Sequence, residues 1–283
     1  MPPLNVFAKS LRDQKWQIAG FGLALAAMSS TSVWLWPSVR DSLQNFEIPA
    51  AARAFLGSDL DFATGAGYLS GRYFGWTEIL AIVYVIIAGT GAIAGEESAS
   101  TIDLLLAQPV SRRAVLLQKL AATALGAALI IFGGYVGFLV SVPTVDMEVP
   151  LSDLAVGCAN MVPIVLFFFA LSLWAGAVAP NRGIAAGFVI GITTATYFVF
   201  TLANGVESLE PIRYATPFYY YGAGRPLVYG VTWWHVGLLL GTSAVLVALT
   251  LRTFERRDVS AGGATDLGLG SVLRRIAALR TGV

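Results

Sequence analysis

Six long runs of apolar residues constrain this chain more than any other feature of its sequence. They cover about residues 18–36, 74–94, 119–142, 154–179, 184–203 and 234–251. A helix rises about 1.5 Å per residue and the hydrocarbon core of a bilayer is about 30 Å thick, so about 20 apolar residues cross it. The sequence therefore predicts an all-α polytopic membrane protein with six transmembrane helices.

Composition excludes most soluble and metal-dependent classes of protein. Of the 283 residues, 56% are hydrophobic and 12% are charged, compared with about 25% charged residues in an ordinary soluble domain. The single cysteine, Cys158, lies in an apolar run, so neither a disulfide framework nor a cysteine metal cluster is expected. The net charge of +1, without a basic block, gives no sign of a nucleic-acid partner. The chain has no catalytic triad and no H-E-x-x-H motif, so we expect no catalytic or metal-binding residues in it.

Three regions follow from the pattern of apolar residues. Residues 1–17 predict an amphipathic cytoplasmic or interfacial helix, because apolar side chains recur there at helical spacing among basic ones. Residues 18–251 form the six-helix transmembrane domain, and residues 252–283 form a cytoplasmic tail that binds either membrane or a partner. The aromatic-rich outer segment 204–233 is either an interfacial anchor or a re-entrant, gate-forming hairpin. The role of the outer segment 37–73 is left open.

The positions of Lys and Arg between the spans predict the orientation, because cytoplasmic loops carry an excess of both. One side of the predicted bundle carries only Arg40, Arg53, Arg72, Arg213 and Arg225. The other side carries all the rest of the 18 Lys and Arg, together with both termini. We therefore expect a multi-pass protein of the plasma membrane with both termini in the cytoplasm. As an alternative, the first span is a cleaved signal peptide, since a basic start precedes an apolar run.

A charged island, residues 95–113, lies between the second and third apolar runs on the predicted cytoplasmic side. Its S-T-I-D stretch matches a capping box, which begins a helix, and Pro109 ends that helix. The result is a short helix over 101–107. One face of this helix would carry Ile102, Leu105 and Leu106. An apolar face held towards the cytosol needs a protein partner; the alternative is an interfacial loop packed on its own bundle.

The order of residues in the island resembles the signature region of permease subunits of type-2 ATP-binding-cassette (ABC) exporters. That pattern runs acid-acid, small residues, Thr, acid, three Leu, Pro-Val-Ser-Arg, and then apolar residues and Lys. The matching residues here are Glu96, Glu97, Thr101, Asp103, Leu104, Leu105, Leu106, Pro109, Val110, Ser111, Arg112, Arg113 and Lys119. The family usually has Gly where Ser100 stands and often Glu where Asp103 stands. The start of the chain, the short connection 179–183 and the charged run 254–258 also agree, so the resemblance covers most of the chain.

The resemblance implies that the 101–107 helix is a coupling helix, seated in a groove of a separate ATP-hydrolysing subunit. It assigns ATPase coupling to Glu96, Glu97, Thr101, Ile102, Asp103, Leu105, Leu106, Pro109, Arg112 and Arg113. It further implies a second permease, either another copy or a paralogue, and ATP and Mg bound in the partner ATPase rather than here. The chain itself has no G-x-x-x-x-G-K-[ST] loop, as required if the motor lies on another polypeptide. Without the resemblance, Glu96 and Glu97 are interpreted as the solvated end of a helix, and Arg112 and Arg113 as cytoplasmic residues that set the orientation.

Four polar residues within the apolar runs are candidates for a translocation path. Glu78 lies near the outer edge of the second predicted span, where it either serves transport or pairs with Arg72 and snorkels to the surface. The others are Thr193, Thr194 and Tyr197 in the fifth span. These hydroxyls either line a path between two permeases or bond the backbone and neighbouring helices.

The hypothesis that explains most of these features is the membrane-spanning permease subunit of an ATP-driven exporter. Two alternatives of other classes remain. A secondary transporter or channel needs no ATPase, but a secondary transporter requires an ion-coupling acid at mid-membrane, where the predicted spans place none. A structural or regulatory membrane protein would use the island to bind a cytosolic partner. The substrate is not identified by the sequence.

Overall fold

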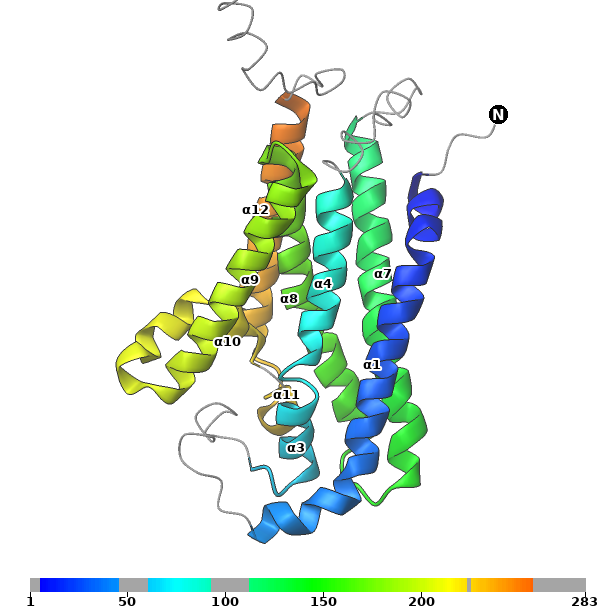
Figure 1. Ribbon diagram of the computed structural model, residues 1–283, viewed down its shortest axis with the longest axis vertical. Helices are drawn as coiled ribbons and strands as arrows, with labels where there is room; N and C mark the ends of the chain where they lie inside the picture. The colour runs from blue at the N-terminus through cyan, green and yellow to red at the C-terminus, as the bar shows by residue number, and fades with distance from the viewer. Residues whose placement is uncertain (1–5, 46–60, 93–111, 223–224, 257–283) are drawn as a thin grey trace, which may run out of the picture.

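The computed structural model describes residues 6–45, 61–92, 112–222 and 225–256, and this part of the chain is helical without strands (Figure 1). The long helices are α1 (Val6–Asn45), α4 (Thr77–Thr90), α7 (Arg112–Ser141), α8 (Leu151–Val178), α9 (Arg182–Gly205) and α12 (Trp233–Arg256). The short ones are α3 (Gly65–Arg72), η2 (Val142–Thr144), η3 (Glu207–Ala215), α10 (Pro217–Tyr221) and α11 (Pro226–Tyr229). In Figure 1, α1 begins and α12 ends at the upper end of the bundle, called here the terminal end. The opposite end is called the far end.

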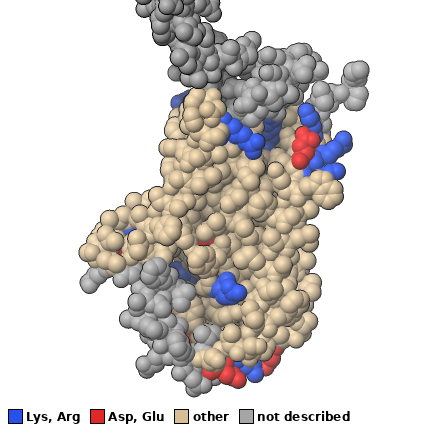
Figure 2. Space-filling model, in the orientation of Figure 1, with Lys and Arg blue, Asp and Glu red and all other residues tan. Residues whose placement is uncertain are grey.

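Six segments of the described chain are long and apolar enough to cross a membrane, which confirms the predicted all-α architecture. They are Lys15–Ser42, Gly65–Thr90, Arg113–Thr144, Leu151–Val178, Arg182–Asn204 and Trp233–Thr253. Charged side chains gather at the two ends of the molecule, and the broad band between them carries few (Figure 2). The bounds differ from the sequence-based ones mainly in the second span, which begins at Gly65 instead of residue 74.

The first helix does not divide into an interfacial piece and a span. Helix α1 is continuous over 40 residues and includes both the predicted amphipathic segment and the first apolar run. Its polar start is tied to the bundle, because the Tyr84 hydroxyl donates to Gln14 Oε1 at 2.6 Å and Gln14 Nε2 donates to Thr123 Oγ1 at 3.2 Å. Gln14 thus points into the protein and joins α1 to α4 and α7.

Glycines allow α1 and α7 to pack backbone against backbone. A Cβ atom added to Gly133 on α7 would lie 2.7 Å from the carbonyl oxygen of Gly22 on α1. One turn further along α7, the Ser30 hydroxyl donates to the carbonyl oxygen of Gly137 at 3.1 Å. Small residues at such positions are typical of membrane helices, which gain stability from close packing because lipid gives them no hydrophobic driving force.

The second span is a broken helix. Helix α3 ends at Arg72 and α4 begins at Thr77, and of the carbonyl groups between them those of Phe74 and Gly75 accept no backbone N–H of the described chain. Two tyrosines from later in the chain satisfy them. The Tyr221 hydroxyl donates to the Phe74 carbonyl at 2.8 Å, and the Tyr197 hydroxyl donates to the Gly75 carbonyl at 3.4 Å. Non-helical backbone at membrane depth is tolerated when neighbouring elements supply such partners.

Helix α8 lies at the centre of the bundle and α9 and α12 lie at its edge. Of the six spans, those containing α4 and α8 are the most buried, and those formed by α9 and α12 are the least buried. Helix α8 contacts α4, α7, α9, α10, α11 and α12. The outer surface of α9 carries large exposed side chains, among them Ile184, Phe188, Ile190 and Phe198.

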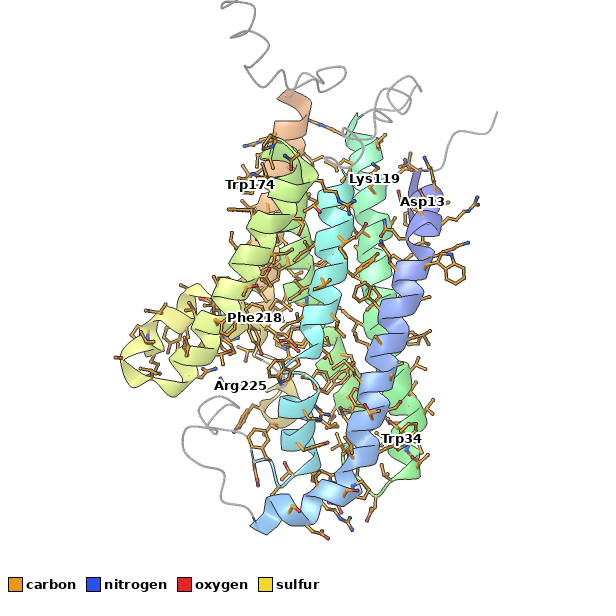
Figure 3. All side chains as sticks on the ribbon, in the orientation of Figure 1. Asp13, Trp34, Lys119, Trp174, Phe218 and Arg225 are labelled. Carbon is orange, nitrogen blue, oxygen red and sulfur yellow. The ribbon has the colours of Figure 1, made fainter. Side chains whose placement is uncertain are left out.

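The aromatic segment between α9 and α12 folds back onto the bundle. After η3, which projects to the side in Figure 1, α10 packs on α8, α9 and α12, and α11 packs on α3 and α8. Phe218 on α10 is 1% exposed, and Asn160 on α8 donates to the Tyr221 carbonyl at 2.8 Å. Figure 3 shows Phe218 inside the molecule with Arg225 just below it. Phe218, Tyr221 and Leu227 of this segment are therefore in the folded core, whereas η3 is largely exposed. Neither sequence-based alternative specified this placement.

Candidate functional site

The island itself lies outside the described residues, and the structure describes only the helices that enter and leave it. This applies to the predicted coupling residues Glu96, Glu97, Thr101, Ile102, Asp103, Leu105, Leu106 and Pro109. Arg112 begins α7 and Arg113 is exposed on its first turn. The chain enters the island from the terminal end of α4 and returns through α7, so both its attachments lie at the terminal end, where Figure 3 places Lys119 and Asp13.

Two basic side chains hold the carboxyl end of α4, directly before the island. Lys119 on α7 is 8% exposed and its Nζ donates to the Ala92 carbonyl at 2.9 Å. Arg182 at the start of α9 donates to the Ile87 carbonyl at 3.0 Å. The last carbonyls of a helix lack intrahelical partners and carry partial negative charge, so cations stabilise them. The end of α4 is thereby fixed to α7 and α9. In the sequence, Lys119 stands in the family pattern and Arg182 in the 179–183 connection, and neither position predicts this contact with α4.

Glu78 lies deeper than its position in the sequence suggested. Because the second span begins at Gly65, Glu78 falls near the middle of a 26-residue segment and not near its edge. Its side chain is 1% exposed, whereas Arg72 is exposed, and no ion pair joins the two. The snorkelling and Arg72-paired interpretations are therefore wrong. The physical reason is the break between α3 and α4, which puts α3 below Glu78 and adds length to the span.

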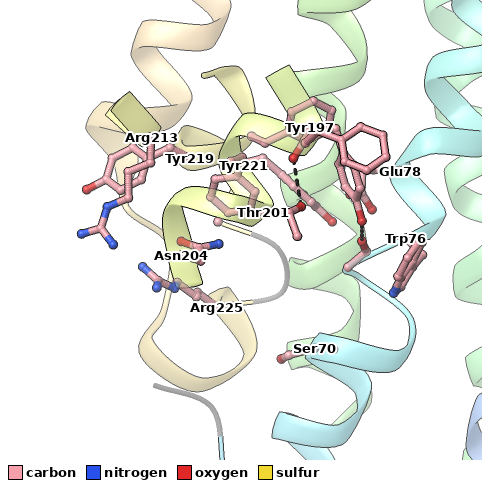
Figure 4. Close-up of a pocket in the computed structure, with 16 residues that line it drawn as sticks. Ser70, Trp76, Glu78, Tyr197, Thr201, Asn204, Arg213, Tyr219, Tyr221 and Arg225 are labelled. Atoms are coloured by element: carbon pink, nitrogen blue, oxygen red, sulfur yellow. Dashed lines mark hydrogen bonds between the residues drawn. The ribbon is translucent and has the colours of Figure 1, made fainter. Parts of the chain in front are cut away.

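Glu78 and Tyr197 line one cavity of about 260 Å³, called here the aromatic pocket (Figure 4). Its aromatic residues are Trp76, Tyr197, Phe198, Phe200, Phe218, Tyr219 and Tyr221. Its polar side chains are Ser70, Glu78, Thr201, Asn204, Arg213 and Arg225. Five elements, α3, α4, α9, η3 and α10, meet around it together with the chain that follows α10. The pocket exists because the broken second span leaves room that the folded-back aromatic segment only partly fills.

Acidic and basic groups lie on different sides of the aromatic pocket. In Figure 4, Glu78 and Trp76 are on one side, and Asn204, Arg213 and Arg225 are on the other. Arg213 Nη2 lies 2.8 Å from Glu210 Oε1, and a hydrogen bond to the Tyr214 hydroxyl raises the pKa of the Arg213 guanidinium above its ordinary value. The charge of Arg213 is thus already compensated.

Tyr221 closes the pocket on the side of α10. It is 2% exposed, and this burial raises the pKa of its phenol well above the ordinary value. The phenol therefore keeps the proton that it donates to the Phe74 carbonyl. Gly222 follows in the left-handed conformation, with φ of 72°, and lets the chain turn away at the end of α10.

The hydroxyls of the fifth span do not form one polar cluster. Thr193 is buried and donates to the carbonyl of Val189, one turn earlier in the same helix, at 2.8 Å. Thr194 is exposed on another face of α9. Of the three predicted residues on this helix, only Tyr197 reaches the aromatic pocket. Successive residues of a helix point about 100° apart, so neighbouring threonines cannot share one face.

Comparison with known proteins gives the family. The model of the ABC-2 family transporter protein matches residues 7–259, which is most of the chain. The chain belongs to the ABC-2 transporter family. None of the curated proteins that were compared matches it.

Family membership accounts for the six spans. ABC-2 permeases are the multi-pass membrane component of the transporter and not the ATPase, so this chain is a membrane component. The predicted resemblance is confirmed over the same region that includes the island.

The sequence did not predict several polar and aromatic residues that line the pocket. They are Trp76, Asn204, Arg213, Tyr221 and Arg225. Their clustering depends on contacts between segments far apart in the sequence, and a chain with 12% aromatic residues offers no local signal for it.

Proposed function

We propose that this ABC-2 permease is the membrane-spanning subunit of an ATP-driven exporter and couples to a separate ATPase subunit through the 101–107 helix. The match to the family over residues 7–259 carries the proposal. ATP and Mg bind in the partner ATPase, and the permease forms the translocation path with a second copy or a paralogue. The terminal end faces the cytoplasm of the cell, with both termini there and the island projecting to the ATPase.

Helix α4 is the element that connects the island to the interior of the membrane. It begins at Thr77, beside Trp76 of the aromatic pocket, and ends at Thr90, a few residues before the island. Lys119 and Arg182 hold its carboxyl end, so a force on the island acts on α4, α7 and α9 together. Motion of the ATPase would in this way change the shape of the pocket at the other end of α4.

The exposed face of α9 supports the pairing of two permeases. Its large apolar side chains alternate with glycines at which an added Cβ would meet nothing within 4 Å, namely Gly187 and Gly191. Small residues spaced four apart let membrane helices approach closely. Interhelical contact across this face would bury surface that a single chain leaves open.

A reconstituted complex tests ATPase coupling. We expect a Leu105→Asp variant to lose most of the ATP hydrolysis that the permease stimulates in its partner, because a carboxylate cannot enter an apolar groove without a large desolvation cost. Leu104→Asp is the matched control, since position 104 points to the opposite face of the predicted 101–107 helix. Equal loss in both variants would contradict the assigned face. Full transport by the purified chain without any ATPase would refute the proposal.

One observation favours a second candidate, a secondary transporter. Such a protein needs an ionisable group at membrane depth, and Glu78 occupies that position near the middle of its span. Liposomes that contain the chain alone separate the two functions. Substrate uptake driven by an ion gradient without ATPase would support the secondary transporter, whereas uptake that needs the ATPase and ATP would exclude it.

A further inference from the structure

The carboxylate of Glu78 is hydrogen-bonded by its own backbone N–H, and one of its two oxygens has no partner among the described residues. Its side chain is 1% exposed, and Oε2 accepts no hydrogen bond from any described residue. Taking a carboxylate out of water without a partner costs several kcal/mol. Its place in the first turn of α4 gives only the weak favourable field of a helix amino end. An acid retained in a membrane span under these conditions indicates a ligand.

The nearest phenols of the aromatic pocket are not available to Glu78. Each phenol has one proton to donate. Tyr197 donates its proton to the Gly75 carbonyl and Tyr221 donates its proton to the Phe74 carbonyl. The basic residues lie on the other side of the pocket (Figure 4), and Arg213 is paired with Glu210. On its α4 side the pocket therefore presents an acid that forms no ion pair with a described residue.

The walls around this acid are aromatic rings. The ring centroids of Trp76 and Tyr197 are 6.0 Å apart, and those of Tyr197 and Phe218 are 5.3 Å apart. The faces of such rings attract cations, most strongly where water is excluded. A metal ion would need several oxygen, nitrogen or sulfur ligands, and the described part of the chain contains no group of three His, Cys, Asp or Glu residues that could hold one.

We propose that the aromatic pocket is a binding site for a hydrophobic organic cation. The positive centre lies against Glu78 Oε2, and the apolar body lies against the rings of Trp76, Tyr197 and Phe218. A cavity of about 260 Å³ is near the small end of the range for small-molecule sites, about 300–1,000 Å³, so it holds a charged centre with a few attached rings. This inference deepens the proposed function. The binding site itself is argued from the pocket alone, and only the transport of the bound cation rests on the proposed function.

Binding of radiolabelled methyltriphenylphosphonium to the full-length chain in nanodiscs tests this assignment. We expect saturable binding that Glu78→Gln weakens by about tenfold or more, the scale of one lost interaction with a charged group. Glu148→Gln is the matched control, because Glu148 is exposed and lies outside the pocket. Triphenylphosphine oxide has a similar shape without the positive charge, so an excess of it should displace little of the label.

A second variant keeps the test decisive if Glu78→Gln does not fold. Trp76 is 57% exposed, so Trp76→Ala should leave the fold intact and weaken binding by about threefold or more through the loss of a cation–ring contact. Unchanged binding in either folded variant would overturn the proposal, as would equal displacement by the neutral analogue. The measurement uses no ATPase. If the parent chain does not bind the label but couples to the ATPase, the ligand class alone is refuted. If it binds the label but does not couple, the ATPase partnership alone is refuted.

Discussion

Substitution of Gly133 by Ala tests how closely α1 and α7 pack. The new Cβ would lie 2.7 Å from the Gly22 carbonyl oxygen and 3.0 Å from the Gly22 Cα, and both are backbone atoms that no side-chain rotation can move. Restoring an ordinary contact of about 3.5 Å requires the two helices to separate by about 0.5–1 Å, which forfeits a quarter to a half of the dispersion energy of each contact across the gap. Overpacking of this kind costs about 1–3 kcal/mol.

Gly20→Ala is the matched control for this substitution. Gly20 lies on α1, and a Cβ added to it would meet nothing within 4 Å. Both variants gain about 1 kcal/mol of helix propensity, so their difference isolates the packing cost. A difference of about 2 kcal/mol lowers the melting temperature by about 4–8 °C on the scale of domains of 150–250 residues.

The single cysteine of the chain provides the assay. Cys158 on α8 is 4% exposed, so a thiol-reactive fluorogenic maleimide labels it only when the bundle opens. We expect Gly133→Ala to become reactive at a lower temperature than Gly20→Ala and the parent chain. Equal transition temperatures for the two alanine variants would show that α1 and α7 are not in close backbone contact.

Four further predictions concern the site. Tyr221→Phe leaves the Phe74 carbonyl without its donor, which should cost about 1–3 kcal/mol and lower the transition in the same cysteine assay; an unchanged transition would argue against this hydrogen bond. Glu78→Gln should melt at the same or a higher temperature, because it removes a buried carboxylate whose Oε2 has no partner among the described residues, and a clear decrease would mean that this oxygen has one. Lys119→Met should reduce ATP hydrolysis stimulated by the permease while the complex still assembles, because the end of α4 loses its cation; normal stimulation would exclude this role. Thr193→Val should leave transport within about twofold, because its hydroxyl bonds only its own helix and that bond contributes about 1 kcal/mol; a large transport defect would return this residue to the path.

The length of apolar runs predicted the spans well, because each span is made of residues that are close together in the chain. A run of about 20 apolar residues must either be buried or lie in lipid, whatever the rest of the protein does. The prediction was wrong where a span was interrupted. The segment 65–73 contains Gly, Ser and Arg and reads as loop, yet the structure joins it to the apolar run as the first part of a broken span. Tyrosines from two distant segments stabilise the break, and no local pattern reveals them.

The error on the second span explains the error on Glu78. Counted from residue 74, Glu78 is near an edge and a surface role follows; counted from Gly65, it is central and buried. The aromatic segment 204–233 was read as an anchor or a gate, but its rings also form the wall of the pocket around this acid. The depth of a side chain in the membrane and the residues that it contacts depend on the folded bundle, and the order of residues in the chain does not give them.

By itself, the sequence determined the number and type of spans, the island between the second and third of them, and through its residue order the ABC-2 family. These follow from the length of apolar runs, the capping and breaking residues, and a motif that is continuous in the chain. The tertiary structure alone decided that α3 and α4 form one broken span, that Lys119 and Arg182 hold the end of α4, and that Glu78 faces a ring-lined pocket. Each of these depends on side chains brought together from different helices, because hydrogen bonds and ring contacts act over a few ångströms in space and are independent of separation along the chain.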